Sequence, residues 1–266
     1  MSATVSIEDR GFTLGDGVFD TALALGGVML ARDRHVARLL ASAATIGIAI
    51  DPARIAAALD AALGPSPMIV RTTLTRGSAA RGLWPLSAGE PTLVVTTAPW
   101  SPAMLGQPAR LVTASASRNE RSPSANLKAL GYLDHILAAR QAAEAGADDA
   151  LILNTQGRVA CSTIANVFAL KDGRLITPPL DEGCLPGIMR AQVIEVAPAL
   201  GLDAVEAPLA PADLASADAV FLTNSLRFIR PVAALDGAPL GTAPLDGLLA
   251  ALRARAAAEC GIDPAG

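Results

Sequence analysis

The stretch SPSANLKALGYLDHILAARQ, residues 122–141, contains Lys128, one of two lysines in the chain, and Tyr132, its single tyrosine. Lys128 stands between a polar segment and an apolar helical pattern. A lysine amine becomes a nucleophile or a base when burial or a neighbouring cation destabilises its ammonium form, and it can then form a Schiff base with a carbonyl group. A guanidinium group cannot replace it in that reaction. The plain structural alternative is an exposed lysine near the start of a helix.

The composition limits the classes of function. The chain has 266 residues, of which 52% are hydrophobic and only 3% aromatic, so Ala, Leu and Val must fill its core. A net charge of -4 argues against a nucleic-acid partner. The N-terminal sequence does not resemble a signal peptide, and the longest apolar run is too short for a membrane span. We therefore expect a soluble, cytoplasmic protein.

The three cysteines are Cys161, Cys184 and Cys260. Their number is odd, and their spacing fits neither a zinc site nor a disulfide framework. We therefore expect no metal centre.

Hydrophobic periodicity and turn residues divide the first half of the chain into helices and strands. The predicted helices span 32–48 and 51–63, and the predicted strands span 68–77, 91–100 and 109–115. The polar segment 117–126 has little periodicity and is predicted to be a linker. The expected domains are therefore a small N-terminal domain over 1–116 and a C-terminal domain over 127–266.

The second half continues as a mixture of helices and short strands. Helices are predicted over 132–147, 185–201 and 244–260, and strands over 149–154, 158–162, 166–170, 174–179 and 219–225. Two α/β lobes joined by a short linker form an α+β fold. A junction between lobes is a common position for a small-molecule site.

Three further segments have the residues of a phosphate site. LPGIMR (185–190) places Pro-Gly before a helix, where free backbone N–H groups can bind an anion, although this pair is more often only a turn. TNSLRFIRPV (223–232) ends a strand with small polar side chains that could contact the same phosphate or only mark the strand's exit. In HVARL (35–39), Arg38 could pair with a phosphate or face solvent.

In their order along the chain, these segments resemble the fold-type IV pyridoxal-phosphate enzymes, the class IV aminotransferase superfamily. The resemblance also covers DRGFTLGDGVFDT (9–21), GRVACSTIANVFAL (157–170) and RLITPPLDEGCLPGIMR (174–190). It implies a two-lobed D-amino acid aminotransferase-like fold, with a smaller N-terminal α/β domain and a larger, barrel-like C-terminal α/β domain. It also implies pyridoxal 5'-phosphate (PLP) as cofactor and a homodimer.

The resemblance implies a role for each matching residue. Lys128 matches the lysine that forms the Schiff base with the cofactor and moves the substrate proton, and Tyr132 matches an aromatic near the cofactor's phenolic oxygen. The remaining cofactor contacts are expected from Arg38, Asn166, Gly187, Ile188, Met189, Asn224 and Ser225. Lys171, in the turn KDG, is then an ordinary surface lysine.

The sequence departs from the family pattern at Cys161, where a glutamate is expected five residues before Asn166. The family glutamate keeps the pyridine nitrogen of the cofactor protonated. A thiol with a pKa of about 8.5 is a weak partner for that nitrogen, unless a positive environment makes it a thiolate. The alternative is that Cys161 is only a small buried side chain. Gly131 stands where the family often has asparagine.

The loop RGSAARGLWP (76–85) bears on the reaction. It has Arg81 for a substrate carboxylate, but Leu83 stands where D-amino acid aminotransferases have a histidine. It is closer to the loop of aminodeoxychorismate lyases, and Arg227 is a second candidate for the substrate. The first hypothesis is therefore a 4-amino-4-deoxychorismate lyase, which eliminates pyruvate to give 4-aminobenzoate. The alternatives are an aminotransferase for D- or branched-chain amino acids with a 2-oxo acid acceptor, and a PLP-binding homologue whose catalysis is impaired by Cys161.

Overall fold

The computed structural model describes residues 4–83 and 89–266, and the chain in it divides into two compact units. The first unit contains residues 1–100 and 127–132, and the second contains 101–126 and 133–266. The division therefore lies near residue 100 rather than 116. The segment 117–126 belongs to the second unit, and the six residues around Lys128 belong to the first.

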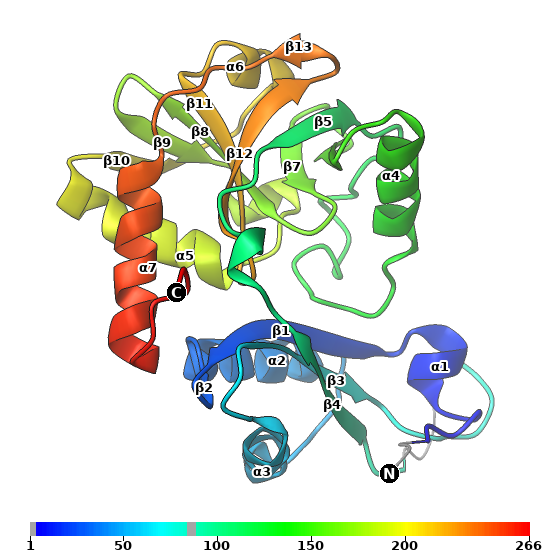
Figure 1. The fold of residues 1–266 in the computed structure, drawn as a ribbon. Coiled ribbons are helices and arrows are strands. Elements are labelled where there is room, and N and C mark those ends of the chain that lie inside the picture. Colours follow the sequence, from blue (N-terminus) through cyan, green and yellow to red (C-terminus); the bar gives the residue numbers. More distant parts are fainter. Residues whose placement is uncertain (1–3, 84–88) are drawn as a thin grey trace. The chain divides into compact units, whose positions relative to one another are not determined.

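The first unit is an antiparallel sheet with two helices packed on it (Figure 1). Its strands are β1 (Gly17–Leu25), β2 (Val28–Met29), β3 (Met68–Thr75) and β4 (Thr92–Pro99), in the order β2-β1-β3-β4. Its helices are α1 (Arg10–Leu14), α2 (Arg32–Thr45) and α3 (Pro52–Ala62). Asp51 caps α3 by accepting a hydrogen bond from the N–H of Ala53, and Pro52 at the first helical position fits the required φ.

The Lys128 segment is held on β1 by backbone hydrogen bonds. The N–H of Phe19 donates to the carbonyl of Lys128 over 2.8 Å, and the N–H of Leu130 donates to the carbonyl of Gly17 over 3.0 Å. Gly17 is required at this close approach, because a Cβ there would lie 2.6 Å from the carbonyl oxygen of Leu74. The position of Lys128 is thus fixed by the start of the central strand of this sheet.

The second unit is built on one nine-stranded sheet, in the order β10-β9-β8-β11-β12-β5-β6-β7, with β13 paired to β12. Its strands are β5 (Ala109–Thr113), β6 (Asp149–Leu153), β7 (Val159–Ser162), β8 (Asn166–Lys171), β9 (Arg174–Thr177), β10 (Asp203–Glu206), β11 (Ala219–Asn224), β12 (Phe228–Leu235) and β13 (Ala238–Pro239). Its α-helices are α4 (Leu133–Glu144), α5 (Ile188–Val196), α6 (Pro211–Ala215) and α7 (Asp246–Cys260). Short 3-10 helices span Pro102–Met104, Leu180–Glu182 and Ala197–Leu200.

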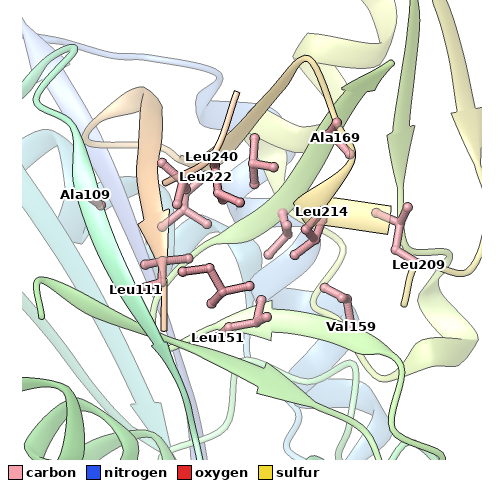
Figure 2. Packing of buried hydrophobic residues seen from close by; sticks show 14 residues of the cluster. Ala109, Leu111, Leu151, Val159, Ala169, Leu209, Leu214, Leu222 and Leu240 are labelled. Carbon is pink, nitrogen blue, oxygen red and sulfur yellow. The ribbon is translucent and has the colours of Figure 1, made fainter. Parts of the chain in front are cut away.

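The hydrophobic core of the second unit packs against one face of this sheet, which we call the inner face. Figure 2 shows the cluster, which includes Leu111, Leu151, Val159, Leu222 and Leu240. Alternate residues of a strand point to opposite faces, so Phe221 and Thr223 of β11 face the other way. On that outer face Phe221 stacks on Phe168 of β8 with ring centroids 5.0 Å apart, and α5 packs against β11. The outer face is the one that carries the N-terminus of α5.

Each helix and strand that the sequence predicts is present in the structure, with some differences at the ends. The helix predicted over 185–201 ends at Val196 and continues as a 3-10 turn, because Pro198 interrupts the α-helical hydrogen bonds. Strands β1, β2, β10, β12 and β13 and helices α1 and α6 were not predicted from the sequence. Within the described ranges, no helix is long and apolar enough to cross a membrane.

From the burial of the inner-face core we predict a large difference in the free energy of unfolding between two leucine truncations. Leu151 is fully buried in the cluster, whereas Leu133 on α4 is 66% exposed. Leu151→Ala should therefore lower the free energy of unfolding by about 2–5 kcal/mol, and Leu133→Ala should change it by less than about 0.5 kcal/mol. Urea unfolding followed by circular dichroism measures both, and equal losses would contradict this packing.

Candidate active site

Lys128 lies in a cluster of charged and aromatic side chains within the first unit. Its Nζ donates a hydrogen bond to the Tyr132 hydroxyl over 3.3 Å and lies 4.5 Å from the centroid of the Phe19 ring. Tyr132 meets the same ring edge-on, with centroids 5.1 Å apart. The Phe19 ring thus contacts both Lys128 and Tyr132.

Arg71 of β3 completes the aromatic part of the cluster. Its guanidinium lies 3.7 Å from the centroid of the Phe19 ring, a cation–π contact. The guanidinium is half-buried, and burial lowers its pKa, while the phenol of Tyr132 opposes this change. No carboxylate forms an ion pair with it among the residues that the structure describes. Arg71 is therefore a cation available to an anionic ligand.

The buried carboxylate of Asp20 holds Arg38 and His35 on the neighbouring helix. Asp20 accepts hydrogen bonds from Nε and Nη2 of Arg38, both over 2.9 Å, and from Nδ1 of His35 over 2.6 Å. Burial acts to raise the pKa of Asp20. The hydrogen bond from His35 and the charges of Arg38, His35 and Lys128 outweigh it, so the pKa of Asp20 is lowered and the carboxyl is ionised.

This environment lowers the pKa of Lys128 to about 8, from its ordinary value of 10.5. Burial is the largest cause, the charges of Arg38 and Arg71 add to it, and Asp20 opposes them. At pH 7 the neutral amine is then roughly 300-fold more populated than in an ordinary lysine. Lys171 is exposed and donates to the hydroxyl of Ser216, so only one of the two lysines lies in such an environment.

A second group of candidate residues meets at the N-terminus of α5 in the second unit. Gly187 is the N-cap residue of α5, and no side chain caps the helix, whose first N–H groups belong to the buried residues Ile188 and Met189. Asn166 lies against this end: its Nδ2 donates to the carbonyl of Leu185 over 2.8 Å. A Cβ on Gly187 would lie 2.0 Å from Oδ1 of Asn166, so a larger residue there would force the Asn166 side chain to move.

The end of β11 belongs to the same outer face, because Thr223 pairs directly with Asn166 of β8. The hydroxyl of Thr223 is buried and has no hydrogen-bond partner within the described residues. Asn224, by contrast, uses Oδ1 to accept hydrogen bonds from the N–H groups of Leu226 and Arg227, which folds the turn that holds Ser225. We call Asn166, Gly187, Ile188, Met189 and Thr223 the outer-face cradle.

The cradle fits a phosphate group. The N–H groups at the start of the nine-residue helix α5 have no side-chain cap, and the buried hydroxyl of Thr223 has no partner within the described residues. These groups can donate hydrogen bonds to phosphate oxygens, and glycine at position 187 permits a close approach. No cluster of metal-ligating side chains occurs in residues 4–83 or 89–266.

Cys161 of β7 is a neutral thiol. It is buried with Cys184 in an apolar cluster between β6, β7 and α4. Burial raises the pKa of the Cys161 thiol to about 12, and the charge of Arg118 only partly opposes this. A thiolate at this position is therefore excluded at neutral pH.

The remaining predicted site residues lie in two other places. Arg81 is exposed, on the loop whose carbonyls at Gly82 and Leu83 accept hydrogen bonds from Arg10, and residues 84 and 85 of that loop lie outside the described ranges. Arg227 lines a small cavity with Arg230 in the second unit. A Cβ added to Gly131 would meet no atom within 4 Å, so the space beside it is open.

Sequence reasoning missed Phe19, Asp20 and Arg71. The available signal was Asp20 itself, an acidic residue inside the apolar strand run GVFDTALAL, because a charge buried in a strand needs a partner.

Comparisons with known proteins identify the family. The sequence model described as amino-transferase class IV matches residues 17–235, so the chain belongs to the class IV aminotransferase family, whose members are PLP-dependent enzymes. The resemblance and fold class predicted from the sequence are confirmed.

Three relatives give the range of activities. A Methanocaldococcus jannaschii protein provisionally named a branched-chain-amino-acid aminotransferase is 36% identical over 88% of this chain and 84% of its own length. The structure of 4-amino-4-deoxychorismate lyase from Pseudomonas aeruginosa is 32% identical, with a TM-score of 0.86 and 96% coverage of both chains. A Mycobacterium tuberculosis aminotransferase, solved in a PLP-bound form, is 25% identical, with a TM-score of 0.87, covering 97% of this chain and 94% of its own.

The pKa of Lys128 can be measured directly because the chain has only two lysines. In a cofactor-free sample with isotope-labelled lysine, NMR should give two side-chain signals, and the Lys171→Arg variant should leave only that of Lys128. We predict that this signal titrates near pH 8, because burial and two arginines disfavour the ammonium form. A titration near pH 10.5 would contradict the described environment.

Proposed function

We propose that this chain binds PLP through Lys128 and eliminates pyruvate from 4-amino-4-deoxychorismate, leaving 4-aminobenzoate. The observation that carries the choice of reaction is the neutral, buried thiol of Cys161 at the position where the family has a glutamate. The second candidate is a transaminase, favoured by the 36% identical M. jannaschii relative.

In this proposal the outer-face cradle and Ser225 hold the phosphate of PLP. When bound, PLP supplies an aldehyde that takes up an amine and a ring that draws electrons from the substrate. Lys128 would hold the cofactor through its neutral Nζ, and with a pKa of about 8 roughly a tenth of this amine is neutral at pH 7.

The same amine then moves the substrate proton. A base with a pKa of about 8 is close to neutral pH, where proton transfer in both directions is efficient. Tyr132 orients Nζ through its hydroxyl. Arg71, held on the Phe19 ring, is the cation that we assign to a substrate carboxylate, with Arg81 of the exposed loop as a second candidate.

In this proposal Cys161 influences the choice of reaction because its thiol carries no negative charge. A neutral thiol gives the pyridine nitrogen no negative charge, so that nitrogen is held protonated less firmly than by a carboxylate. Transamination depends on the full electron-drawing power of the ring. Elimination of pyruvate from aminodeoxychorismate also gains the free energy of forming an aromatic ring, so a weaker electron sink suffices.

The proposed reaction is tested by the products of the PLP-loaded protein. With 4-amino-4-deoxychorismate we expect pyruvate and 4-aminobenzoate in equal amounts. With D-alanine, leucine or isoleucine alone we expect little conversion of the cofactor to pyridoxamine phosphate. The opposite pattern, with no pyruvate and full conversion by an amino acid, would establish the transaminase. Activity with neither would favour a PLP-binding protein with impaired catalysis.

Replacing Cys161 should shift the balance between these reactions. Cys161→Glu restores a carboxylate, so we expect it to raise the rate of cofactor amination relative to pyruvate release by about tenfold or more, since one pKa unit on the nitrogen corresponds to a factor of ten. The matched control is Cys161→Ser, which stays neutral and should leave the ratio nearly unchanged. The same ratio in both variants would mean that position 161 does not influence the reaction.

A further inference from the structure

A small cavity lies on the inner face of the nine-stranded sheet. Two arginines and one aspartate are among its lining residues, which are Asp149, Ile164, Ala165, Leu222, Asn224, Arg227 and Arg230. The cavity is open to solvent, and its enclosed space of about 10 Å³ is room for roughly one water-sized group, so a larger ion bound there would stay partly in solvent.

This cavity and the outer-face cradle lie on opposite faces of the sheet. Leu222 of β11 pairs directly with Arg230 of β12, so their side chains share a face, and Leu222 belongs to the inner core. Thr223, the next residue, faces outward beside Asn166. A ligand in the cavity would therefore not occupy the phosphate position that we propose for PLP.

The two arginines of the cavity lack the partners that most arginines of this chain have. Neither Arg227 nor Arg230 forms an ion pair within the described part of the chain. Burial lowers the pKa of Arg230, and the charge of Arg227 lowers it further, so the two guanidinium groups are close enough to repel each other. Nε of Arg230 donates a hydrogen bond to the carbonyl of Gln107 over 3.3 Å.

Asp149 does not fill the place of a partner. Its carboxylate accepts hydrogen bonds from the hydroxyls of Ser162 and Thr163 and from the N–H groups of Ala150 and Thr163. Three of these hydrogen bonds end on Oδ1 and one, from Ser162, on Oδ2, so the carboxylate is hydrogen-bonded to groups of β6, β7 and the residue after β7. Asp149 and the neighbouring Asp148 offset part of the charge of Arg230 from a distance.

We propose that this cavity binds a small oxyanion, inorganic phosphate or a carboxylate, between the guanidinium groups of Arg227 and Arg230. Two half-buried like charges are costly without a counter-charge, and arginine forks match the oxygens of phosphate and carboxylate. The backbone N–H of Arg227 is fixed by Asn224, so one of the two cations is held on an ordered turn. The inference does not rest on the proposed reaction.

The test is thermal unfolding in low-salt buffer with added phosphate or acetate, at an ionic strength matched with chloride. At about tenfold the dissociation constant, the bound anion should raise the Tm of the wild-type chain by about 3–5 °C. Arg227→Gln and Arg230→Gln should each abolish most of this rise. Arg140→Gln is the matched control, since Arg140 pairs with Glu144 on the exposed face of α4 and its loss should leave the rise intact.

The two anions separate the sources: a rise with phosphate alone assigns a phosphate site, and one with acetate alone assigns a carboxylate site. Without added anion, both variants should be at least as stable as the wild-type chain, because one of two repelling charges is gone. The proposal is overturned if both variants keep the full rise, or if neither anion raises the wild-type Tm above chloride.

The measurement is made on the cofactor-free chain and repeated after loading with PLP. We expect the anion effect in both, because the cavity and the cradle lie on opposite faces. An effect that disappears on PLP loading would assign the anion to the cradle and overturn this proposal. A chain that fails to load PLP would overturn the proposed function and leave the test on the cofactor-free chain decisive. If Arg230→Gln does not fold, Arg227→Gln carries the test.

Discussion

Two backbone hydrogen bonds hold the Lys128 segment along the first residues of β1, and the site in the first unit depends on them. They join Phe19 to Lys128 and Leu130 to Gly17. The chain returns to the first unit for only six residues, between two stretches that belong to the second. Because β1 also carries Phe19 and Asp20, this pairing brings the amine to the aromatic ring and to the carboxylate at once. The position of Lys128 beside Phe19 and Asp20 thus follows from these main-chain hydrogen bonds.

The electrostatic balance around Lys128 explains why this position has a lysine in a chain whose other basic residues are mostly arginine. Asp20 is paired with Arg38 and hydrogen-bonded to His35, and its negative charge only partly stabilises the ammonium form of Lys128. Burial, Arg38 and Arg71 act in the other direction and prevail. An arginine at 128 would retain its charge there, since its pKa is far higher, and could not become a nucleophile. Burial also shifts the pKa of Cys161, but in the upward direction, and there it keeps the thiol neutral.

The sequence was informative where the signal is local. Lys128, the glycine before α5 and the alternation in β8 and β11 depend on residue type and spacing, and the α+β class follows from them. β1 was missed because its residues are buried on both faces and do not alternate between apolar and polar, and such a run cannot be told from a helix by its period. β12 contains Pro231, which weakens a strand prediction. Arg71 and Asp20 could not be placed beside Lys128, because their proximity arises from strand pairing over more than fifty residues.

The covalent attachment of the cofactor tests the central claim most directly. The purified chain is incubated with PLP, reduced with borohydride, digested and mapped by mass spectrometry, which locates any phosphopyridoxyl group on a lysine. We predict full modification at Lys128 and none at Lys171, with the Lys171→Arg variant labelled to the same extent. Modification at Lys171, or a chain that takes up no PLP, would contradict it.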